Sequence, residues 1–209
     1  MKNLNPILIR SFDLILALIL ALTLLPVMLF AMVLSALFIG FPPVYLSGRR
    51  GKNGVLFKHV KIKSLLPGEE IGRIFFERNR LNWCEKFLRH FHLDELTELF
   101  HIISGKMSFV GPRPILPKQL EGLDSRIRET VPPGWTGTAQ LLLLKKGKLN
   151  KHLQIRLDNL YAKKRSLIYN LQIMAATVRY FFIRKKLDLN PDSTPDRIKF
   201  HKENLGGRP

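Results

Sequence analysis

Acidic residues and cysteines are both scarce in this chain of 209 residues. Only 16 residues are Asp or Glu against 34 Lys and Arg, which gives a formal net charge of +18. Cys84 is the single cysteine, so no disulfide can form within the chain, and a lone thiol fits a reducing compartment. So large a positive charge favours an anionic partner: a nucleic acid, an acidic membrane surface or a phosphorylated substrate.

The chain also lacks the composition of a disordered basic tail. Hydrophobic residues make up 46% of it and its mean hydropathy is +0.02, whereas disordered segments combine high charge with low hydrophobicity. No internal repeat is visible. The length favours one domain, which is enough to bury a core without disulfides.

A run of 26 residues without a charge, Leu14 to Ile39, lies near the start of the chain. An unbroken helix of that length would be roughly 39 Å long, and about 30 Å spans the hydrocarbon core of a bilayer. The run is longer than the apolar region of a secretory signal peptide, and it is too uniformly apolar for a helix with one buried face. It therefore predicts a membrane-embedded segment.

The flanks and the midpoint of this run indicate that it returns to the side from which it enters. Lys2 and Arg10 precede the run. Six basic residues follow it: Arg49, Arg50, Lys52, Lys58, Lys61 and Lys63. Basic flanks mark the cytoplasmic side, and Pro26 lies at the midpoint, where proline kinks or breaks a helix. We therefore favour a re-entrant helix–break–helix segment, and a single tilted span is the alternative.

The chain after Pro42-Pro43 predicts a β-hairpin with a basic loop. Val44 to Leu46 and Val55 to Ile62 both have strand-like composition. Between them, residues 47–54 are rich in turn-forming and basic residues. Such a loop can hold a phosphate through backbone N–H groups and charge, or it can be an ordinary turn that lies on anionic lipid headgroups.

A helix that begins with an acidic pair is predicted further along. Apolar residues recur at helical spacing, and they are Leu93, Leu96, Phe100 and Ile103. Gly105 is a suitable C-terminal stop. Asp94 and Glu95 then lie in the first turn, where unpaired N–H groups and the helix dipole favour ionised carboxylates. Such carboxylates can serve as nucleophile, base or metal ligand, although acidic residues are also common helix starters.

The residues around this pair favour magnesium and phosphate over zinc. The region contains three histidines: His90, His92 and His101. No tight Cys/His spacing supports a zinc site, and a carboxylate site for phosphates suits Mg²⁺ better. Arg113 lies between Pro112 and Pro114, which present its guanidinium with little loss of chain entropy. Arginine is suited to bidentate capture of phosphate oxygens, and a rigid surface turn is the alternative.

These motifs together resemble the bacterial sugar transferase family. Its members are small monotopic phosphoglycosyl transferases that begin glycoconjugate assembly on polyprenol phosphate. The matching segments are, in order, Arg10-Ser11-Phe12-Asp13, Arg49-Arg50-Gly51 with Gly54, Phe57 and Lys61, Leu93-Asp94-Glu95-Leu96, Gly105 to Pro114, Pro133 to Gln140, and Asp158 with Tyr161. Each segment alone is a weak match, but their common order over about residues 10–185 is specific.

The resemblance implies a reaction and a set of site residues. A sugar-1-phosphate would pass from a UDP-sugar to undecaprenyl phosphate with release of UMP. Asp94 would be the nucleophile that forms a phosphosugar–aspartyl intermediate, which the polyprenol phosphate then attacks. Glu95 would hold Mg²⁺ together with Asp94 or assist proton transfer. The positions implied to bind phosphates or substrate are Lys61, Arg89, Arg113, Arg128, Thr136, Gln140 and Asp158.

The residues and the resemblance together predict an α-rich α+β fold at the cytoplasmic face of the bacterial inner membrane. Residues 1–42 would form the re-entrant anchor, 43–189 one catalytic domain with a short β-hairpin, and 190–209 a loosely ordered tail. The expected partners are a UDP-sugar, undecaprenyl phosphate and membrane lipid. Nucleic acid is not expected, because the sequence contains no zinc-finger or RNA-recognition motif. The donor sugar, the pathway and the oligomeric state are left open.

Two alternatives remain at this point. The chain can be a catalytically inactive basic scaffold on the membrane that binds anionic lipid or a nucleotide-sugar. A second choice concerns an apolar stripe at helical spacing, which consists of Leu167, Leu171, Met174, Val178 and Phe181. We expect this stripe to pack against the core, and a position in the membrane interface is the alternative.

Overall fold

The computed structural model describes residues 5–65 and 82–188, so the predicted tail lies outside the described residues. The helices are α1 (Asn5–Phe38), α2 (Trp83–His90), α3 (Glu98–Ile103), α4 (Thr138–Lys146), α5 (Lys151–Lys164) and α6 (Leu167–Asp188). The strands are β1 (Val44–Arg50), β2 (Leu56–Ile62), β3 (Ser108–Val110) and β4 (Gly134–Thr136). Short 3-10 turns are η1 (Lys52–Gly54), η2 (Leu93–Glu95), η3 (Pro117–Leu120) and η4 (Arg128–Thr130). The predicted α-rich α+β class is confirmed.

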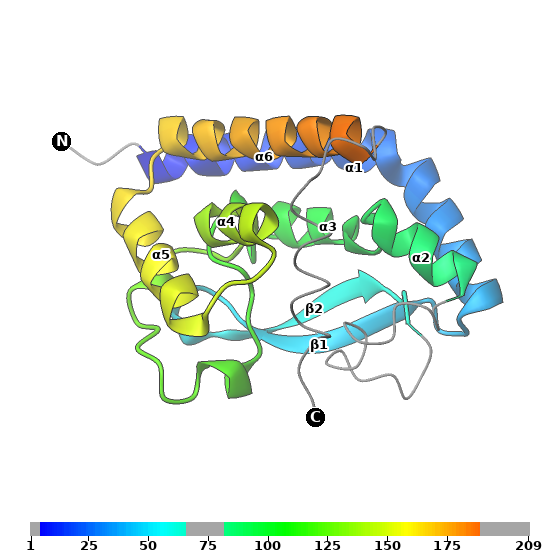
Figure 1. The fold of residues 1–209 in the computed structure, drawn as a ribbon, viewed down its shortest axis with the longest axis horizontal. Helices are drawn as coiled ribbons and strands as arrows, with labels where there is room; N and C mark the ends of the chain where they lie inside the picture. Colours follow the sequence, from blue (N-terminus) through cyan, green and yellow to red (C-terminus); the bar gives the residue numbers. More distant parts are fainter. Residues whose placement is uncertain (1–4, 66–81, 189–209) are drawn as a thin grey trace, which may run out of the picture.

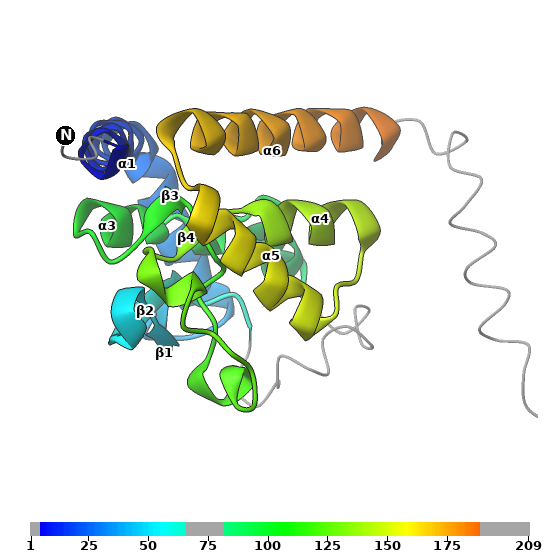
Figure 2. The same cartoon turned by 90° about the vertical axis from the view of Figure 1, so that its left-hand side faces the viewer.

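Figures 1 and 2 show how these elements are layered. The first half of α1 and the whole of α6 form one outer layer. Helices α3 and α4 lie beneath it, and the β1–β2 hairpin lies beyond α3 and α4. The catalytic motifs predicted from the sequence therefore lie between an apolar helical layer and the hairpin.

Helix α1 is one continuous helix of 34 residues that bends. Figure 1 shows its first half level with α6 and its second half turning toward α2. Pro26 lies inside the helix, and proline is a usual cause of such a bend. The predicted break near Pro26 is therefore wrong. Proline removes one backbone hydrogen bond, and the remaining bonds keep the chain helical on both sides.

Polar contacts join the beginning of α1 to the rest of the protein. The Arg10 guanidinium donates to the carbonyl oxygens of Ile102 and Ile103 at 2.5 and 2.6 Å. These carbonyls belong to the last turn of α3, where cationic donors are favoured. Asp13 is 3% exposed and accepts a 2.7 Å hydrogen bond from the Ser108 hydroxyl. The Arg-Ser-Phe-Asp motif therefore connects α1 to α3 and β3.

The far end of α1 is joined to the same body. The Ser35 hydroxyl donates to the Lys63 carbonyl at 2.7 Å. Between the two ends, Ala17 and Ala31 are fully buried against the body. Large apolar side chains point outward, including Ile15, Leu18, Ile19, Leu22, Leu29, Phe30, Val33 and Leu37. Within residues 5–65 and 82–188, α1 is the one helix long and apolar enough to cross a membrane, which indicates membrane association.

The apolar stripe of α6 lies largely on the surface. Leu171, Val178 and Phe181 are 43%, 54% and 40% exposed. The buried face of the helix carries Asn170 and Ile173 instead. The expectation of core packing is therefore wrong for these three residues. Because α6 lies in the outer layer (Figure 2), only one narrow side of it can contact the body.

The predicted hairpin is confirmed, and its first strand is longer than expected. β1 and β2 pair in antiparallel fashion, with Tyr45 opposite Lys61 and Ser47 opposite His59. The pairing continues to Arg50, so much of the predicted basic loop is strand. This register fixes which side chains of β2 lie on the same face.

A second sheet joins two motifs that are distant in sequence. β3 and β4 are parallel, with Ser108 opposite Gly134 and Val110 opposite Thr136. A Cβ atom at Gly134 would lie 1.9 Å from the backbone nitrogen of Gly111. Only glycine therefore fits at this position, and the close approach holds the segment after β3 against β4.

Replacing Gly134 by alanine tests this close approach. Gly134→Ala should lower the free energy of unfolding by about 3 kcal/mol, because the backbone of Gly111 cannot yield as a flexible side chain would. Thermal unfolding of the detergent-solubilised protein measures the loss. Gly48→Ala is the matched control, since nothing lies within 4 Å of its added Cβ atom. Equal stability of the two variants would contradict the steric argument.

Candidate functional site

The acidic pair lies on a separate 3-10 turn. η2 carries Asp94 and Glu95, and α3 begins only at Glu98. The predicted single helix from Leu93 is therefore wrong. His92, just before the turn, has φ +54°, a left-handed conformation that residues other than glycine seldom adopt. Such backbone strain is often found at functional sites, and here it directs the chain sharply into the acidic pair.

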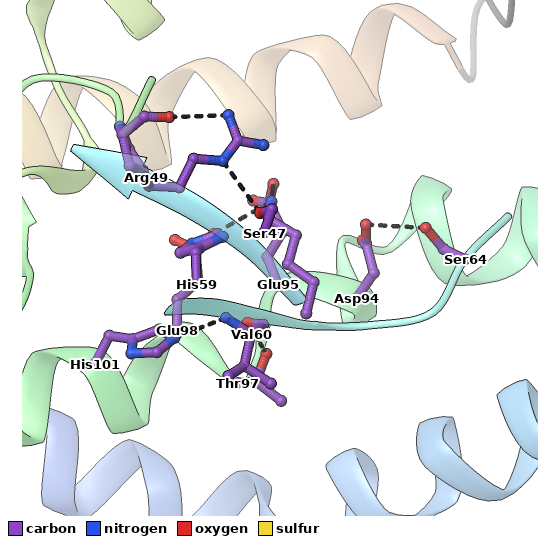
Figure 3. A network of polar contacts seen from close by, with 12 residues as sticks. Ser47, Arg49, His59, Val60, Ser64, Asp94, Glu95, Thr97, Glu98 and His101 are labelled. Atoms are coloured by element: carbon purple, nitrogen blue, oxygen red, sulfur yellow. Dashed lines mark hydrogen bonds and ion pairs between the residues drawn. The ribbon is translucent and has the colours of Figure 1, made fainter. Parts of the chain in front are cut away.

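Both backbone polar groups of one residue of β2, Val60, are held by the chain that follows this turn. The Val60 N–H donates to Nε2 of His101 at 2.9 Å, and the Val60 carbonyl accepts from the Thr97 hydroxyl at 2.8 Å (Figure 3). Thr97 and His101 are one helical turn apart, so their side chains project in the same direction. This Val60 clamp fixes the position of the neighbouring residues His59 and Lys61 relative to α3.

Beside the clamp, two basic side chains of β2 face two carboxylates. Nζ of Lys61 lies 2.5 Å from Oε1 of Glu95 and 3.2 Å from Oε1 of Glu98. Nε2 of His59 lies 3.1 Å from the same Glu98 oxygen. Neither ring nitrogen of His59 makes a hydrogen bond within the described ranges, so this is a close contact without an aligned N–H···O bond. His59 and Glu98 are 2% and 4% exposed.

These contacts keep Glu95 and Lys61 ionised at neutral pH. Burial alone would raise the pKa of Glu95, but the charge and hydrogen bond of Lys61 lower it to about 2. Burial alone would lower the pKa of Lys61, but Glu95 and Glu98 raise it above its usual range. The pair therefore carries opposite charges in a largely desolvated place.

The charge of Asp94 is less well compensated. The Ser64 hydroxyl donates to Oδ2 of Asp94 at 3.2 Å. Burial and the neighbouring charge of Glu95 raise the pKa of Asp94, while Lys61, this hydrogen bond and Arg89 lower it. The first two effects prevail, so an added positive charge would favour the ionised form.

Asp94 and Glu95 have the chemistry of a magnesium site. Their oxygens are the ligands that Mg²⁺ prefers, and this ion is usually held by one or two carboxylates together with substrate phosphates. No group of three or more His, Cys, Asp or Glu side chains that could hold a metal occurs among residues 5–65 and 82–188. The pair fits a metal that is bound together with a phosphorylated substrate.

A small cavity lies beside the acidic pair and is formed by the hairpin, η2, α3, β4, α4 and the segment after β3. Its lining residues are Arg49, His59, Lys61, Glu95, Glu98, Arg113, Pro114, Gly134, Trp135 and Gln140. Burial and the adjacent charge of Arg113 lower the pKa of Arg49. Two guanidinium groups that repel one another at one cavity favour an anionic ligand between them.

Four of the residues expected to contact substrate or metal thus meet at one cavity: Lys61, Glu95, Arg113 and Gln140. Gln140 is 8% exposed, and its Oε1 atom has no hydrogen-bond partner in the described part of the chain. A buried acceptor without a partner is costly, so this amide is available to a ligand. Asp94 adjoins Glu95, and the charge of Arg89, on α2, acts on Asp94.

Arg128 and Asp158 form a buried ion pair and do not line the cavity. Nε of Arg128 is 3.0 Å from Oδ2 of Asp158, and the two residues are 3% and 1% exposed. Burial raises the pKa of Asp158 to about 6, although Arg128 opposes the shift. Arg128 also donates to the Arg113 carbonyl at 2.6 Å, so this pair can support the cavity through the backbone of Arg113. Direct substrate binding by Arg128 and Asp158 stays a prediction.

The hydroxyl of Thr136 is 2.9 Å from that of Thr177 on α6. Thr136 therefore connects β4 to the outer helical layer. Thr136 lies next to the lining residue Trp135 but does not itself line the cavity. Its predicted contact with substrate stays a prediction.

Sequence reasoning did not single out Arg49, His59, Ser64 and Glu98 as site residues. Two sequence spacings could have indicated that His59 and Glu98 belong to the site. His59 and Lys61 are two residues apart on a strand, and Glu95 and Glu98 are one helical turn apart. Each spacing places two side chains on one face, but neither reveals which face it meets. His101, considered above for zinc, is an acceptor for the Val60 backbone.

The Val60 clamp predicts a specific pH dependence of stability. Burial and the nearby His59 lower the pKa of His101 from 6.5 to about 4. The unfolded chain therefore takes up this proton first, so the contribution of His101 is complete above pH 6.5 and is lost as the pH falls toward 4. His101→Gln keeps an acceptor that can reach the position of Nε2 but cannot titrate, so its stability should fall less steeply over this range in pH-dependent denaturation.

His101→Leu provides the contrast. It leaves the partly buried Val60 N–H unpaired, which should cost about 1 kcal/mol at pH 7. An unchanged pH dependence in His101→Gln, or a fully stable His101→Leu, would contradict the clamp.

Comparison with known proteins places this site in a family. Residues 4–184 match the bacterial sugar transferase family. The exopolysaccharide production protein ExoY of Sinorhizobium fredii is 30% identical over 189 residues, which cover 81% of this chain and 83% of that protein. The sugar transferase EpsL of Bacillus subtilis is 28% identical over 195 residues, or 92% of this chain and 96% of that protein.

A longer relative is similar to this chain over about a third of its own length. The undecaprenyl-phosphate galactose phosphotransferase of Salmonella typhimurium is 29% identical over 160 residues, which cover 67% of this chain and 33% of that protein. The family match spans every element that lines the cavity, from the hairpin to α4. The chain belongs to the bacterial sugar transferase family.

Proposed function

We propose that this protein transfers a sugar-1-phosphate from a UDP-sugar to undecaprenyl phosphate and releases UMP. This reaction would be the first membrane step in assembling a bacterial polysaccharide or glycoprotein glycan. Family membership makes the chain a phosphoglycosyl transferase family enzyme, and the name of the Salmonella relative specifies undecaprenyl phosphate for that protein. The observation that carries the proposal is an acidic pair beside a cavity with two guanidinium groups.

In the first step, a carboxylate oxygen of Asp94 attacks the phosphorus that bears the sugar. The bond from that phosphorus to the UMP oxygen breaks, UMP leaves, and a phosphosugar–aspartyl group remains. Phosphoryl transfer depends mainly on positioning and charge neutralisation. Arg49 and Arg113 face the same cavity and can hold phosphate oxygens by bidentate hydrogen bonds.

In the second step, a phosphate oxygen of undecaprenyl phosphate attacks the same phosphorus. The bond to Asp94 breaks, the carboxylate is restored, and a sugar diphosphate linked to the lipid is formed. The two substrates therefore react in turn at one carboxylate, which explains how a small cavity can serve both.

Asp94 and Glu95 would hold Mg²⁺ in this site. When bound, the ion neutralises phosphate charge. Lys61 keeps Glu95 ionised, and the neighbouring negative charge of Glu95 raises the pKa of Asp94. A cation held by both carboxylates would keep Asp94 ionised for attack.

A re-entrant position of α1 in the inner membrane accounts for the contacts at both of its ends. Arg10 bonds to the end of α3 and Ser35 bonds to Lys63, which supports a helix whose two ends lie on one side of the bilayer. The exposed apolar residues of α6 support an interfacial position for that helix. The cavity would then lie at the cytoplasmic membrane surface, within reach of the phosphate of a lipid acceptor.

The substitution Asp94→Asn tests the proposed reaction. Purified protein, undecaprenyl phosphate, Mg²⁺ and a panel of UDP-sugars should give UMP release with a preferred donor. Asp94→Asn should lower kcat by roughly 10³-fold or more, because the amide cannot form the covalent intermediate. Mass spectrometry should find a phosphosugar adduct on Asp94 when the acceptor is omitted.

Asp124→Asn is the matched control for this change, since the Asp124 side chain is 58% exposed and pairs with Arg126. It should keep the turnover of the unaltered protein. Turnover by Asp94→Asn equal to that of this control would refute the nucleophile, and a protein inactive with every donor would favour the inactive scaffold.

Cysteine labelling tests the re-entrant topology. In a protein whose buried Cys84 has been replaced by alanine, Asn5→Cys and Lys52→Cys place one thiol on each flank of α1. Membrane-impermeant thiol reagents should label neither position in intact cells and both in inverted membrane vesicles. Labelling of one position in intact cells would instead establish a helix that spans the bilayer.

A further inference from the structure

Two carboxylates already neutralise the charge of Lys61, which lines the cavity. It contacts Glu95 at 2.5 Å and Glu98 at 3.2 Å, and its side chain is 20% exposed. Arg49 and Arg113 make no ion pair with a carboxylate within the described ranges, and Arg113 is exposed. An ammonium shared by two carboxylates is poorly suited to bind a phosphate as well. The two arginines are better placed for that task.

Glu98 is the inner of the two carboxylates. Its side chain is 5% exposed, and its Oε1 atom lies 3.2 Å from Lys61 and 3.1 Å from His59. Glu98 begins α3, one helical turn after Glu95. It therefore holds the Lys61 ammonium from the interior side while Glu95 contacts it from the side of Asp94.

The backbone supports this arrangement. The Val60 clamp fixes the residue between His59 and Lys61 to Thr97 and His101. Both basic side chains are thereby presented to Glu98 with little freedom to move away. A buried charge contact of this kind, anchored on both sides, can set the position of a third group.

We infer that Glu98 is a positioning residue for the transfer reaction. It holds Lys61 against Glu95 and so fixes the Glu95 carboxylate next to Asp94, while the donor phosphates are bound by the arginines. This inference rests on the proposed function. It assigns Lys61 to the support of the acidic pair, although the family resemblance implied that Lys61 binds substrate.

Three variants test the inference by steady-state UMP release: Glu98→Gln, Lys61→Met and the double variant. Glutamine keeps the shape and an acceptor oxygen but loses the charge. Glu98→Gln should lower kcat about tenfold and change KM for the UDP-sugar by less than about twofold, because it acts on the acidic pair and not on donor binding. Lys61→Met should lower kcat about 100-fold, also with KM nearly unchanged.

The double variant provides the decisive measurement. If Glu98 acts through Lys61, the double variant should be no slower than Lys61→Met to within about twofold, since residues in one chain of contacts are not additive. A product of the two single effects, about 1,000-fold, would overturn the inference. Glu98→Gln with unaltered kcat, or with a raised KM alone, would overturn it as well.

Glu129→Gln is the matched control. Glu129 is a buried glutamate paired with Arg50 at 3.0 Å, and it does not line the cavity. The same chemical change at this position should leave kcat within about twofold of the unaltered protein. An equal loss in this control would show that burial of a glutamine causes the effect, and would overturn the inference.

A further variant covers the case in which Glu98→Gln does not fold. His59→Gln with Glu98→Gln removes both members of a buried contact, which is generally better tolerated than removing one. This variant should still show the tenfold lower kcat, because Lys61 again lacks its inner partner. Full activity in it would overturn the inference, whereas an unaltered protein that releases no UMP would refute the proposed function and this inference with it.

Discussion

The Val60 clamp is the contact on which the site depends. Two side chains of one helical turn bind both backbone polar groups of a single strand residue, Val60, and these two bonds set the register between the hairpin and the segment that carries Asp94 and Glu95. A shift of β2 by one residue would turn His59 and Lys61 away from Glu98 and Glu95. The electrostatics of the cavity are therefore a consequence of backbone hydrogen bonding.

Although the net charge of the chain is +18, three carboxylates gather at the site. Glu95 and Glu98 share the Lys61 ammonium, and Asp94 lies next to them with its charge incompletely balanced. Arg49 lines the cavity from β1, and Arg113 lines it from the segment that follows β3 of the β3–β4 sheet. In the proposed reaction a carboxylate attacks an anionic phosphate, which requires nearby cations to offset the repulsion, and the two arginines would supply that charge while Lys61 stays paired with Glu95 and Glu98.

Direct contacts join the apolar helical layer to the polar site. α1 contributes two buried alanines to the body and large apolar side chains to its outer face, while Arg10 and Asp13 bond to α3 and β3. The helix that associates with the membrane is thus directly attached to the catalytic segment. In the proposed reaction between a soluble donor and a lipid-linked acceptor, such attachment would keep Asp94 at a constant depth.

Features that depend on neighbouring residues could be predicted from the sequence, and those that depend on distant partners could not. The apolar run, the hairpin, the Asp94-Glu95 pair and the Arg113 turn follow from composition and short spacings. The pairing of His59 with Glu98, the burial of Arg128 against Asp158 and the outward face of α6 required long-range packing, because each depends on chain segments at least ten residues apart. The bend of α1 at Pro26 belongs to the same group, since a local rule allows either a kink or a break, and only contacts along the helix select between them.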